Sequence, residues 1–273
     1  MNRLLRGLAV FIGAFGRPIV GGLESLTRLT KLTLETLYWV FVGPFTGKTR
    51  FRKLVFPLMQ QIGVFSLFIT CLVAVLIGAI LVLQTGDKFE DYGAKNIIPK
   101  MICIAIVREL GPLMTAIVLS GRVGAAFTAG LGSMVINEEV LALRTMGINP
   151  VGYLVAPRFI AIFIMLPVLT MYSYLFGNIG GLVVGTLNFN IPFWSYYSTV
   201  RNAFDMVDII GGLVKAAIFG GIICMVACHN ALTVRGGPEG VGRNTMVSVV
   251  MSLVSIIVAD ALIDGVLLNR FYK

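Results

Sequence analysis

The sequence predicts an all-α polytopic membrane protein. Of its 273 residues, 57% are hydrophobic and 13% are charged, and the mean hydropathy is +0.91. A soluble domain carries about 25% charged residues, so this chain has too few to cover a soluble surface. The same composition excludes intrinsic disorder, which requires low hydrophobicity. Four cysteines in a chain of this length also exclude a disulfide scaffold.

Five apolar stretches reach the length of about 20 residues that a helix needs to cross a bilayer. The predicted spans are Ile62–Leu83, Met101–Leu119, Phe159–Leu187, Ile209–Leu232 and Thr245–Leu268. Residues 188–208, rich in asparagine and aromatic side chains, are predicted to form a turn with an interfacial aromatic belt. Residues 54–273 are therefore expected to form a single five-helix transmembrane domain.

The first 53 residues are expected to form a cytoplasmic segment with an amphipathic helix in the membrane interface. Within residues 19–42, apolar side chains share one helical stripe, as in interfacial helices. The stripe consists of Leu23, Leu26, Thr30, Leu34, Leu37 and Phe41. A short sixth span is the alternative, and the four charges within residues 24–35 disfavour it.

The net charge of +9 predicts the orientation of the chain. Residues 1–53 hold nine basic and two acidic side chains, a net charge of +7. Because Lys and Arg are retained on the cytoplasmic side, the N-terminus and the segments 120–158 and 233–244 are expected in the cytoplasm. The loops 84–100 and 188–208 and the C-terminus are expected outside. The charge is thus assigned to orientation, and no nucleic-acid partner is expected.

Three motifs resemble cofactor or metal sites but fail their requirements. Val42–Thr49 ends like a phosphate-binding loop, yet Val42 stands where that loop requires glycine. Gly237–Gly242 fails the dinucleotide-binding spacing and is interpreted as a flexible cytoplasmic turn. Cys224, Cys228 and His229 favour helix packing over a zinc site, which needs further ligands. No cofactor, metal or catalytic group is therefore expected on this chain.

Small residues recur every fourth position in three stretches, a spacing that lets helix backbones approach closely in lipid. This spacing serves either contacts within the chain or the seam of a homodimer. The three sets are Gly177, Gly181 and Gly185; Gly212, Ala216 and Gly220; and Gly121, Ala125 and Ala129.

Five charged residues fall inside the predicted spans, where each costs roughly 2.5–3.5 kcal/mol at a helix centre. Arg108 and Glu109 are adjacent and point about 100° apart on a helix, so each needs another partner. Lys215 stands alone in the fourth span, and Asp260 and Asp264 share one face of the fifth. These residues form either structural ion pairs or a polar-walled cavity for a charged headgroup, and both can hold together.

A short capped helix is predicted at about 137–147, between the second and third spans. Asn137 is a suitable N-cap and Gly147 a suitable stop. Glu138 and Glu139 suit the positive first turn. Val140, Leu143 and Met146 form an apolar stripe, which is typical of a helix that docks in the groove of a soluble partner.

Four sequence motifs resemble the MlaE family of ABC-transporter permeases. The motifs are Val107–Pro112, Ser120–Ala126, Asn137–Pro150 and Val155–Arg158, and the resemblance covers about residues 55–268. It implies a homodimeric permease in the inner membrane of a Gram-negative bacterium that moves phospholipids between the inner and outer membranes. It also implies separate ATPase subunits, which bind ATP and Mg, and a periplasmic MCE-domain protein.

The same resemblance assigns roles to individual residues. Glu138 to Met146 match the coupling helix that contacts the ATPase, with Glu138, Glu139, Leu143 and Met146 as its site residues. Arg108, Glu109, Lys215 and Asp260 match polar positions of the substrate cavity. The chain departs from many members at Gly130, where they carry an acidic residue, and at Glu139, where they carry glutamine.

An ion-coupled secondary transporter of an amphipathic solute is the alternative function. In such a protein Glu109, Asp260 and Asp264 would titrate during transport. It predicts internal repeats between two halves, and neither a convincing repeat nor an even number of spans is present.

Overall fold

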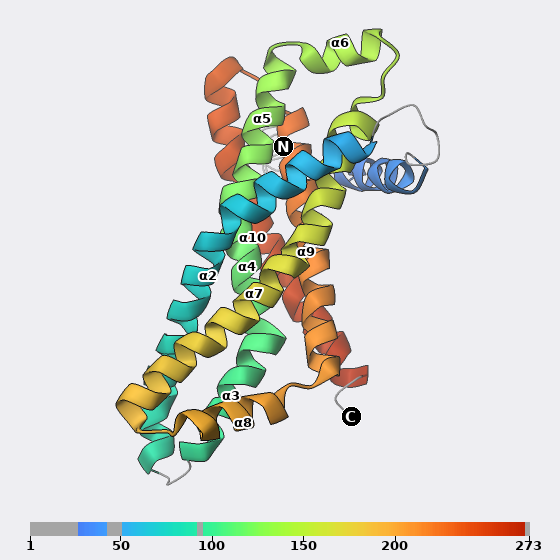
Figure 1. Cartoon of the computed structure of the whole chain (residues 1–273). Helices are drawn as coiled ribbons and strands as arrows, with labels where there is room; N and C mark the ends of the chain where they lie inside the picture. Colours follow the sequence, from blue (N-terminus) through green and yellow to red (C-terminus); the bar gives the residue numbers. More distant parts are fainter. Residues whose placement is uncertain (1–26, 43–50, 92–94, 271–273) are drawn as a thin grey trace, which may run out of the picture.

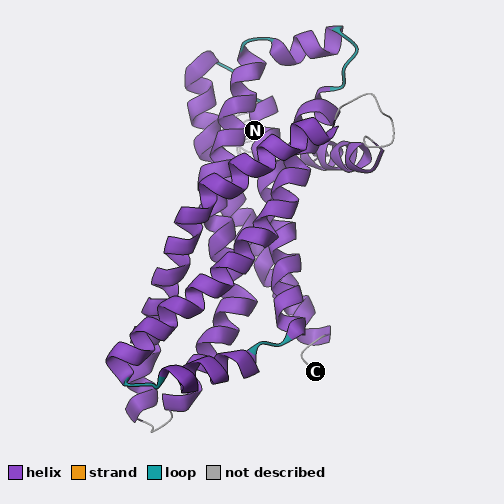
Figure 2. Cartoon of the chain, viewed as in Figure 1, coloured by secondary structure: helices purple, strands orange, loops and turns teal. Residues whose placement is uncertain are grey.

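The structure, a computed structural model, describes residues 27–42, 51–91 and 95–270. Over these ranges it consists of helices joined by short loops and contains no strand (Figure 2). Five helical stretches are long and apolar enough to cross a membrane: Lys53–Gly86, Lys95–Ile136, Val151–Phe189, Met206–Leu232 and Gly237–Gly265. The predicted fold class is therefore confirmed. The first four predicted spans lie within these stretches, and the fifth, Thr245–Leu268, lies within the helix Gly237–Arg270 that contains the last stretch.

The five stretches are built from the following elements. The first is α2 (Phe51–Asp91), and the second joins η1 (Lys95–Ile97), α3 (Ile98–Ala105), η2 (Ile106–Leu110), α4 (Gly111–Leu119), η3 (Ser120–Gly124) and α5 (Ala125–Ile136). The third joins η4 (Val151–Val155) and α7 (Ala156–Phe189), the fourth is α9 (Met206–Leu232), and the fifth is α10 (Gly237–Arg270). The short helices α6 (Glu139–Thr145) and α8 (Phe193–Ala203) lie at opposite ends of the bundle (Figure 1), hereafter the α6 end and the α8 end.

Helices α2 and α7 cross with their backbones in contact. A Cβ atom on Gly78 would strike the carbonyl of Gly177, and one on Gly180 would strike the backbone of Val75. Nearer the start of α7, a Cβ on Gly220 of α9 would lie 3.0 Å from the Ile162 carbonyl oxygen. Small residues thus bring α2 and α9 onto α7, as close packing in lipid requires. The glycines of α7 and α9 serve contacts within the chain.

The second span is longer than predicted. The helix continues from Leu119 through η3 and α5 to Ile136, so residues 120–136 extend the helix of the second span and do not form a loop. Gly121, Arg122 and Gly124 interrupt the apolar pattern and obscured this continuation. The structure accommodates Arg122 by a hydrogen bond to the Ser66 hydroxyl and by placing its guanidinium carbon 5.8 Å from the Phe65 ring centre.

The fifth span starts earlier than predicted, and the expected flexible turn at Gly237–Gly242 is wrong. Gly236 and Gly237 take positive φ values of 90° and 73°, and α10 begins at once. Pro238 stands in the first turn of the helix, where backbone N–H groups have no acceptor within the helix. The absence of an N–H at proline therefore costs no hydrogen bond. A Cβ at Gly240 would strike the Arg235 carbonyl. These glycines therefore serve a tight turn into a helix.

Residues 188–208 contain the helix α8 in place of the predicted turn. One face is buried, since Tyr196 packs against Gly181 and Gly185 of α7. Phe193, Trp194 and Tyr197 form a cluster of exposed rings, and Trp194 is 75% exposed. The aromatic residues predicted for this region are present, and a helix presents them at the end of the spans.

The N-terminal helix, described over 27–42, lies against the start of the third span. Leu32 and Thr36 are buried, and a Cβ at Gly152 would strike the Trp39 ring. The predicted apolar stripe faces elsewhere, because Leu34 and Phe41 are 68% and 70% exposed. The stripe residues Leu23 and Leu26 and most of the segment 42–49 lie outside the described residues.

Candidate functional site

Within the second span, the π-helical turn η2 widens the helix at Arg108 and Glu109. In η2 the Gly111 N–H bonds to the Ile106 carbonyl, five residues back. Pro112, which follows, has no N–H to give to the Arg108 carbonyl, its partner in a regular helix. The Nζ atom of Lys215 lies 3.3 Å from that carbonyl oxygen and donates to it. The Gly111-Pro112 pair thus frees a backbone acceptor inside the span, and the fourth span supplies its donor.

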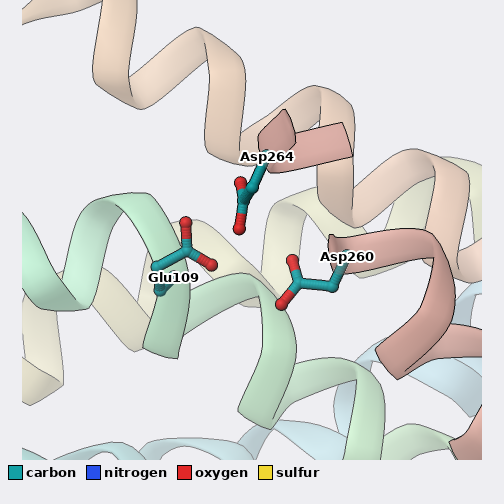
Figure 3. A group of neighbouring side chains, drawn as sticks. All are labelled: Glu109, Asp260 and Asp264. Carbon is teal, nitrogen blue, oxygen red and sulfur yellow. The ribbon is translucent and has the colours of Figure 1, made fainter. Parts of the chain in front are cut away.

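The Lys215 ammonium lies among three carboxylates. Its Nζ is 2.7 Å from Glu109 Oε1 and 3.5 Å from Asp260 Oδ1, and it contacts Asp264 Oδ1 directly. The three carboxyl groups converge from the second and fifth spans (Figure 3). Only 3% of the Lys215 side chain is exposed. The cluster therefore joins three spans through one buried cation. Structural ion pairs among the intramembrane charges, one of the two readings of the sequence, are present, and the structure gives Glu109, Asp260 and Asp264 as the partners of Lys215.

A second ion pair lies beside this cluster. Arg108 Nε is 2.9 Å from Asp208 Oδ2, near the start of α9. Asp208 is buried, and its other carboxylate oxygen, Oδ1, has no hydrogen-bond partner among the described residues. An unpaired buried acceptor of this kind is costly, and a ligand or an ordered water can satisfy it.

The two ion pairs border one cavity of about 330 Å³. Its polar lining comes from Arg108, Glu109, Asp208, Lys215 and Asp264. Its apolar lining comes from Met101, Ile104 and Ala105 of α3 and from Gly211 and Gly212 of α9. A volume of 330 Å³ is at the lower end of the range for small-molecule sites. The arrangement can therefore hold a small polar group beside apolar surface.

The carboxylates could also be read as a metal site, because ligand oxygens of Glu109, Asp260 and Asp264 lie within 4.8 Å of one another. The Lys215 ammonium already occupies the space between them. A divalent ion there would meet the positive charge of Lys215 at contact distance, so the lysine acts as the cation of this cluster. Among the described residues, Cys224, Cys228 and His229 form no group of three ligands with other side chains.

Three of the four residues assigned to the substrate cavity, Arg108, Glu109 and Lys215, line the cavity. The fourth, Asp260, is not among the lining residues and lies 3.5 Å from the Lys215 ammonium. Asp208 was missed, because it lies at the edge of a predicted outer loop, where an acidic residue is unremarkable. Asp264, noted in the sequence for sharing a face with Asp260, lines the cavity directly. Gly130, where many family members carry an acid, faces open space with nothing within 4 Å of its Cβ position.

Helix α6 forms between the second and third spans with two differences from its prediction. Its N-cap is Glu138, in the left-handed region at φ 61°, and Asn137 instead ends α5. Its end is as predicted, because Gly147 has φ 74° and the Gly147 and Ile148 amides bond to the Arg144 and Leu143 carbonyls. This pattern is the Schellman motif.

The apolar stripe predicted for α6 is divided between two surfaces. Val140 is buried and Leu143 packs against the bundle core, so neither side chain is available to contact a partner. Met146 is 64% exposed, and Leu141, which the sequence did not single out, is 55% exposed. The exposed apolar surface of α6 is therefore formed by Leu141 and Met146, next to Glu138 and Glu139.

Comparisons with known proteins agree on one family. A family model described as Permease MlaE matches residues 55–266. Relatives from Synechocystis and Rickettsia typhi, each named "Probable ABC transporter permease protein", are both 35% identical, over 81% and 80% of this chain and 84% of each relative. The Arabidopsis thaliana protein TRIGALACTOSYLDIACYLGLYCEROL 1, chloroplastic, is 33% identical over 80% of this chain and 62% of its own length.

The family assignment agrees with the five long apolar helices. ABC-transporter permeases work with ATPase partners and are not themselves ATPases, which makes α6 the candidate contact with such a partner. The chain therefore belongs to the MlaE permease family and is a multi-pass membrane subunit of an ABC transporter.

Proposed function

We propose that this permease moves phospholipids between the inner and outer membranes of a Gram-negative bacterium. It lies in the inner membrane with its N-terminus and α6 in the cytoplasm and its C-terminus in the periplasm. Two copies pair, an ATPase binds each α6, and a periplasmic MCE-domain protein continues the path from the α8 end. The observation that carries this proposal is a charged cavity inside an otherwise apolar bundle.

The cavity fits an amphipathic substrate. Its charged groups can receive a headgroup, while the apolar side chains of α3 that line it, Met101 and Ile104, can receive the start of the acyl chains. Met101 is 52% exposed. The name of the plant relative refers to trigalactosyldiacylglycerol, a lipid. Intramembrane charges mark substrate pathways by default, because they are too costly to keep otherwise.

The path from the ATPase to the cavity follows the second span. A two-residue turn joins α6 to α5, and α5 continues through η3, α4 and η2 to Arg108 and Glu109. A displacement of α6 would therefore act on the end of one continuous helical stretch, Lys95–Ile136, which contains two π-helical turns and leads to the cavity. ATP would shift the permease between two states only if the ATPase contacts α6 differently in each state.

Reconstitution tests this function. The permease, its ATPase and the MCE-domain protein are placed in donor vesicles with labelled phospholipid, and transfer to acceptor vesicles is measured. We expect transfer that requires ATP and stops when the ATPase cannot hydrolyse it. Co-purified phospholipid, counted by mass spectrometry, provides an independent readout. A complex that hydrolyses ATP but neither holds nor transfers phospholipid would contradict the proposal.

Substitution of the cavity separates transport from assembly. Arg108→Gln with Glu109→Gln should lower bound lipid and transfer, while the ATPase still co-purifies, because α6 is unchanged. Unchanged lipid content in this double variant would remove the cavity from the proposal. The alternative of an ion-coupled transporter loses support from the assignment to a family of ABC-transporter permeases.

A further inference from the structure

We infer that the cavity selects phospholipids whose headgroup carries a primary ammonium, such as phosphatidylethanolamine. This inference rests on the proposed function and specifies the chemistry of the headgroup. It follows from the balance of charges around the cavity and from one unsatisfied acceptor, Asp208.

The charged groups that line the cavity comprise two cations and three carboxylates. The cations are Arg108 and Lys215, and the carboxylates are Glu109, Asp208 and Asp264. A fourth carboxylate, Asp260, lies 3.5 Å from the Lys215 ammonium and is not among the lining residues. Both cations are engaged within the chain, Lys215 with three carboxylates and Arg108 with Asp208. An anionic headgroup would have to compete with these ion pairs for a cation, whereas an ammonium would meet acidic groups in excess. The charge balance therefore favours a headgroup that carries its own positive charge.

Asp208 adds an observation that is independent of this charge balance. It is only 4% exposed and lines the cavity. Arg108 engages its Oδ2 atom, and Oδ1 accepts no hydrogen bond among the described residues. A buried carboxylate oxygen needs a donor. A primary ammonium supplies three N–H donors, a quaternary ammonium supplies none, and hydrogen bonds between charged groups are about twice as strong as neutral ones.

Lys215 shows that the site accepts this chemistry. Its ammonium is held by Glu109 at 2.7 Å, by direct contact with Asp264, and by the Arg108 carbonyl at 3.3 Å. Glu109 and Asp264 keep 40% and 28% of their side chains exposed beside the cavity. A second ammonium entering from the cavity would find the partly exposed carboxylates of Glu109 and Asp264 as acceptors, with the carboxylate of Asp208 in the same wall. The phosphate that follows it would lie toward Arg108, the cation that lines the cavity.

Competitive loading tests the inference on the intact complex of permease and ATPase. The complex is reconstituted in nanodiscs with equal amounts of phosphatidylethanolamine and phosphatidylglycerol, and in a second set with phosphatidylethanolamine and phosphatidylcholine. Lipid retained after extraction is counted by native mass spectrometry. We expect phosphatidylethanolamine to be enriched about fivefold over each competitor, the effect of one additional hydrogen bond. Equal retention, or enrichment of either competitor, would overturn the inference.

Two variants locate the selectivity. Asp208→Asn should bring the retained ratio close to the nanodisc composition while total bound lipid persists. Asp205→Asn is the matched control, because Asp205 is exposed three residues earlier and caps α9 through the Val207 amide, which asparagine also does. The control should retain the wild-type ratio. Should Asp208→Asn fail to fold, Asp264→Asn replaces it with the same expectation.

The two proposals fail in different ways. If no variant and no wild-type complex retains lipid, the proposed lipid transport is wrong. If lipid is retained at the nanodisc ratio by the wild-type complex, lipid transport stands and the headgroup inference is wrong. Selectivity that survives both Asp208→Asn and Asp264→Asn also overturns the inference.

Discussion

The ammonium of Lys215 on α9 lies 2.7 Å from the carboxylate of Glu109, 106 positions earlier in the chain. The two residues belong to different spans, and the π-helical turn at Ile106–Leu110 carries Glu109. Asp260 and Asp264 complete the set from the fifth span. One lysine thus joins three of the helices that are predicted to cross the membrane.

Removal of the Lys215 ammonium should destabilise the fold strongly. Lys215→Met leaves three carboxylates without their common cation, and loss of one partner of a buried pair costs on the order of 3–5 kcal/mol. The partial exposure of Glu109 and Asp264 places the expected loss at the lower end of this range. Thermal unfolding of the purified protein in nanodiscs measures it.

Restoring the charge balance should recover part of that loss. Lys215→Met combined with Glu109→Gln and Asp264→Asn should unfold at a higher temperature than Lys215→Met alone, as coupled neighbours do. A triple variant that is less stable than the single one would show that Lys215 acts through packing alone.

The crossing of α2 and α7 should not tolerate one added methyl group. In Gly180→Ala, the new Cβ meets the Val75 backbone, which cannot rotate away. Overpacking of this kind costs about 1–3 kcal/mol. Gly130→Ala is the control, since nothing lies within 4 Å of its Cβ and alanine favours the helix. A lowered melting temperature is expected for Gly180→Ala only, and equal melting temperatures would contradict the crossing.

The exposed face of α6 should carry the contact with the ATPase. Leu141→Glu with Met146→Glu places two charges on this face without touching the core, so the permease should fold and lose its ATPase on co-purification. Asn202→Glu, exposed at the α8 end, should retain the ATPase. Full retention by the double variant would rule out Leu141 and Met146 as the docking face.

A side-chain bridge between Asn149 and Glu35 should help to hold the N-terminal helix. Asn149 donates from Nδ2 to Glu35 Oε1 over 2.8 Å, and its Oδ1 accepts the Val151 amide. Glu35→Ala removes only the bridge, so amide exchange in residues 27–42 should quicken about fivefold. Glu35→Gln keeps an acceptor and should exchange like the wild type.

Asn149→Ala removes both the bridge to Glu35 and the hydrogen bond by which Asn149 caps the Val151 amide. It should quicken exchange in residues 27–42 and also at the start of the third span, where the cap contributes about 1 kcal/mol. Wild-type exchange in Glu35→Ala would mean that the packing of Leu32, Thr36 and Trp39 holds the helix without the bridge.

The sequence by itself determined the helical class, the number of spans, the family and the intramembrane positions Arg108, Glu109, Lys215 and Asp260. These features depend on local quantities, namely the length of apolar runs, the cost of a charge in lipid and the identity of a short motif. The end of α6 at Gly147 could also be predicted from the local sequence, because the left-handed conformation after the end of a helix favours glycine.

The tertiary structure decided which of these residues meet. The sequence could not pair Arg108 with Asp208 or give Lys215 three carboxylates, because such pairs depend on the rotation of one helix against another. It also could not select Gly180 for the tightest crossing or turn Val140 inward and Leu141 outward. The rotation and depth of each helix are fixed by the packing of all five spans together. The pattern of residues along the chain does not specify that packing.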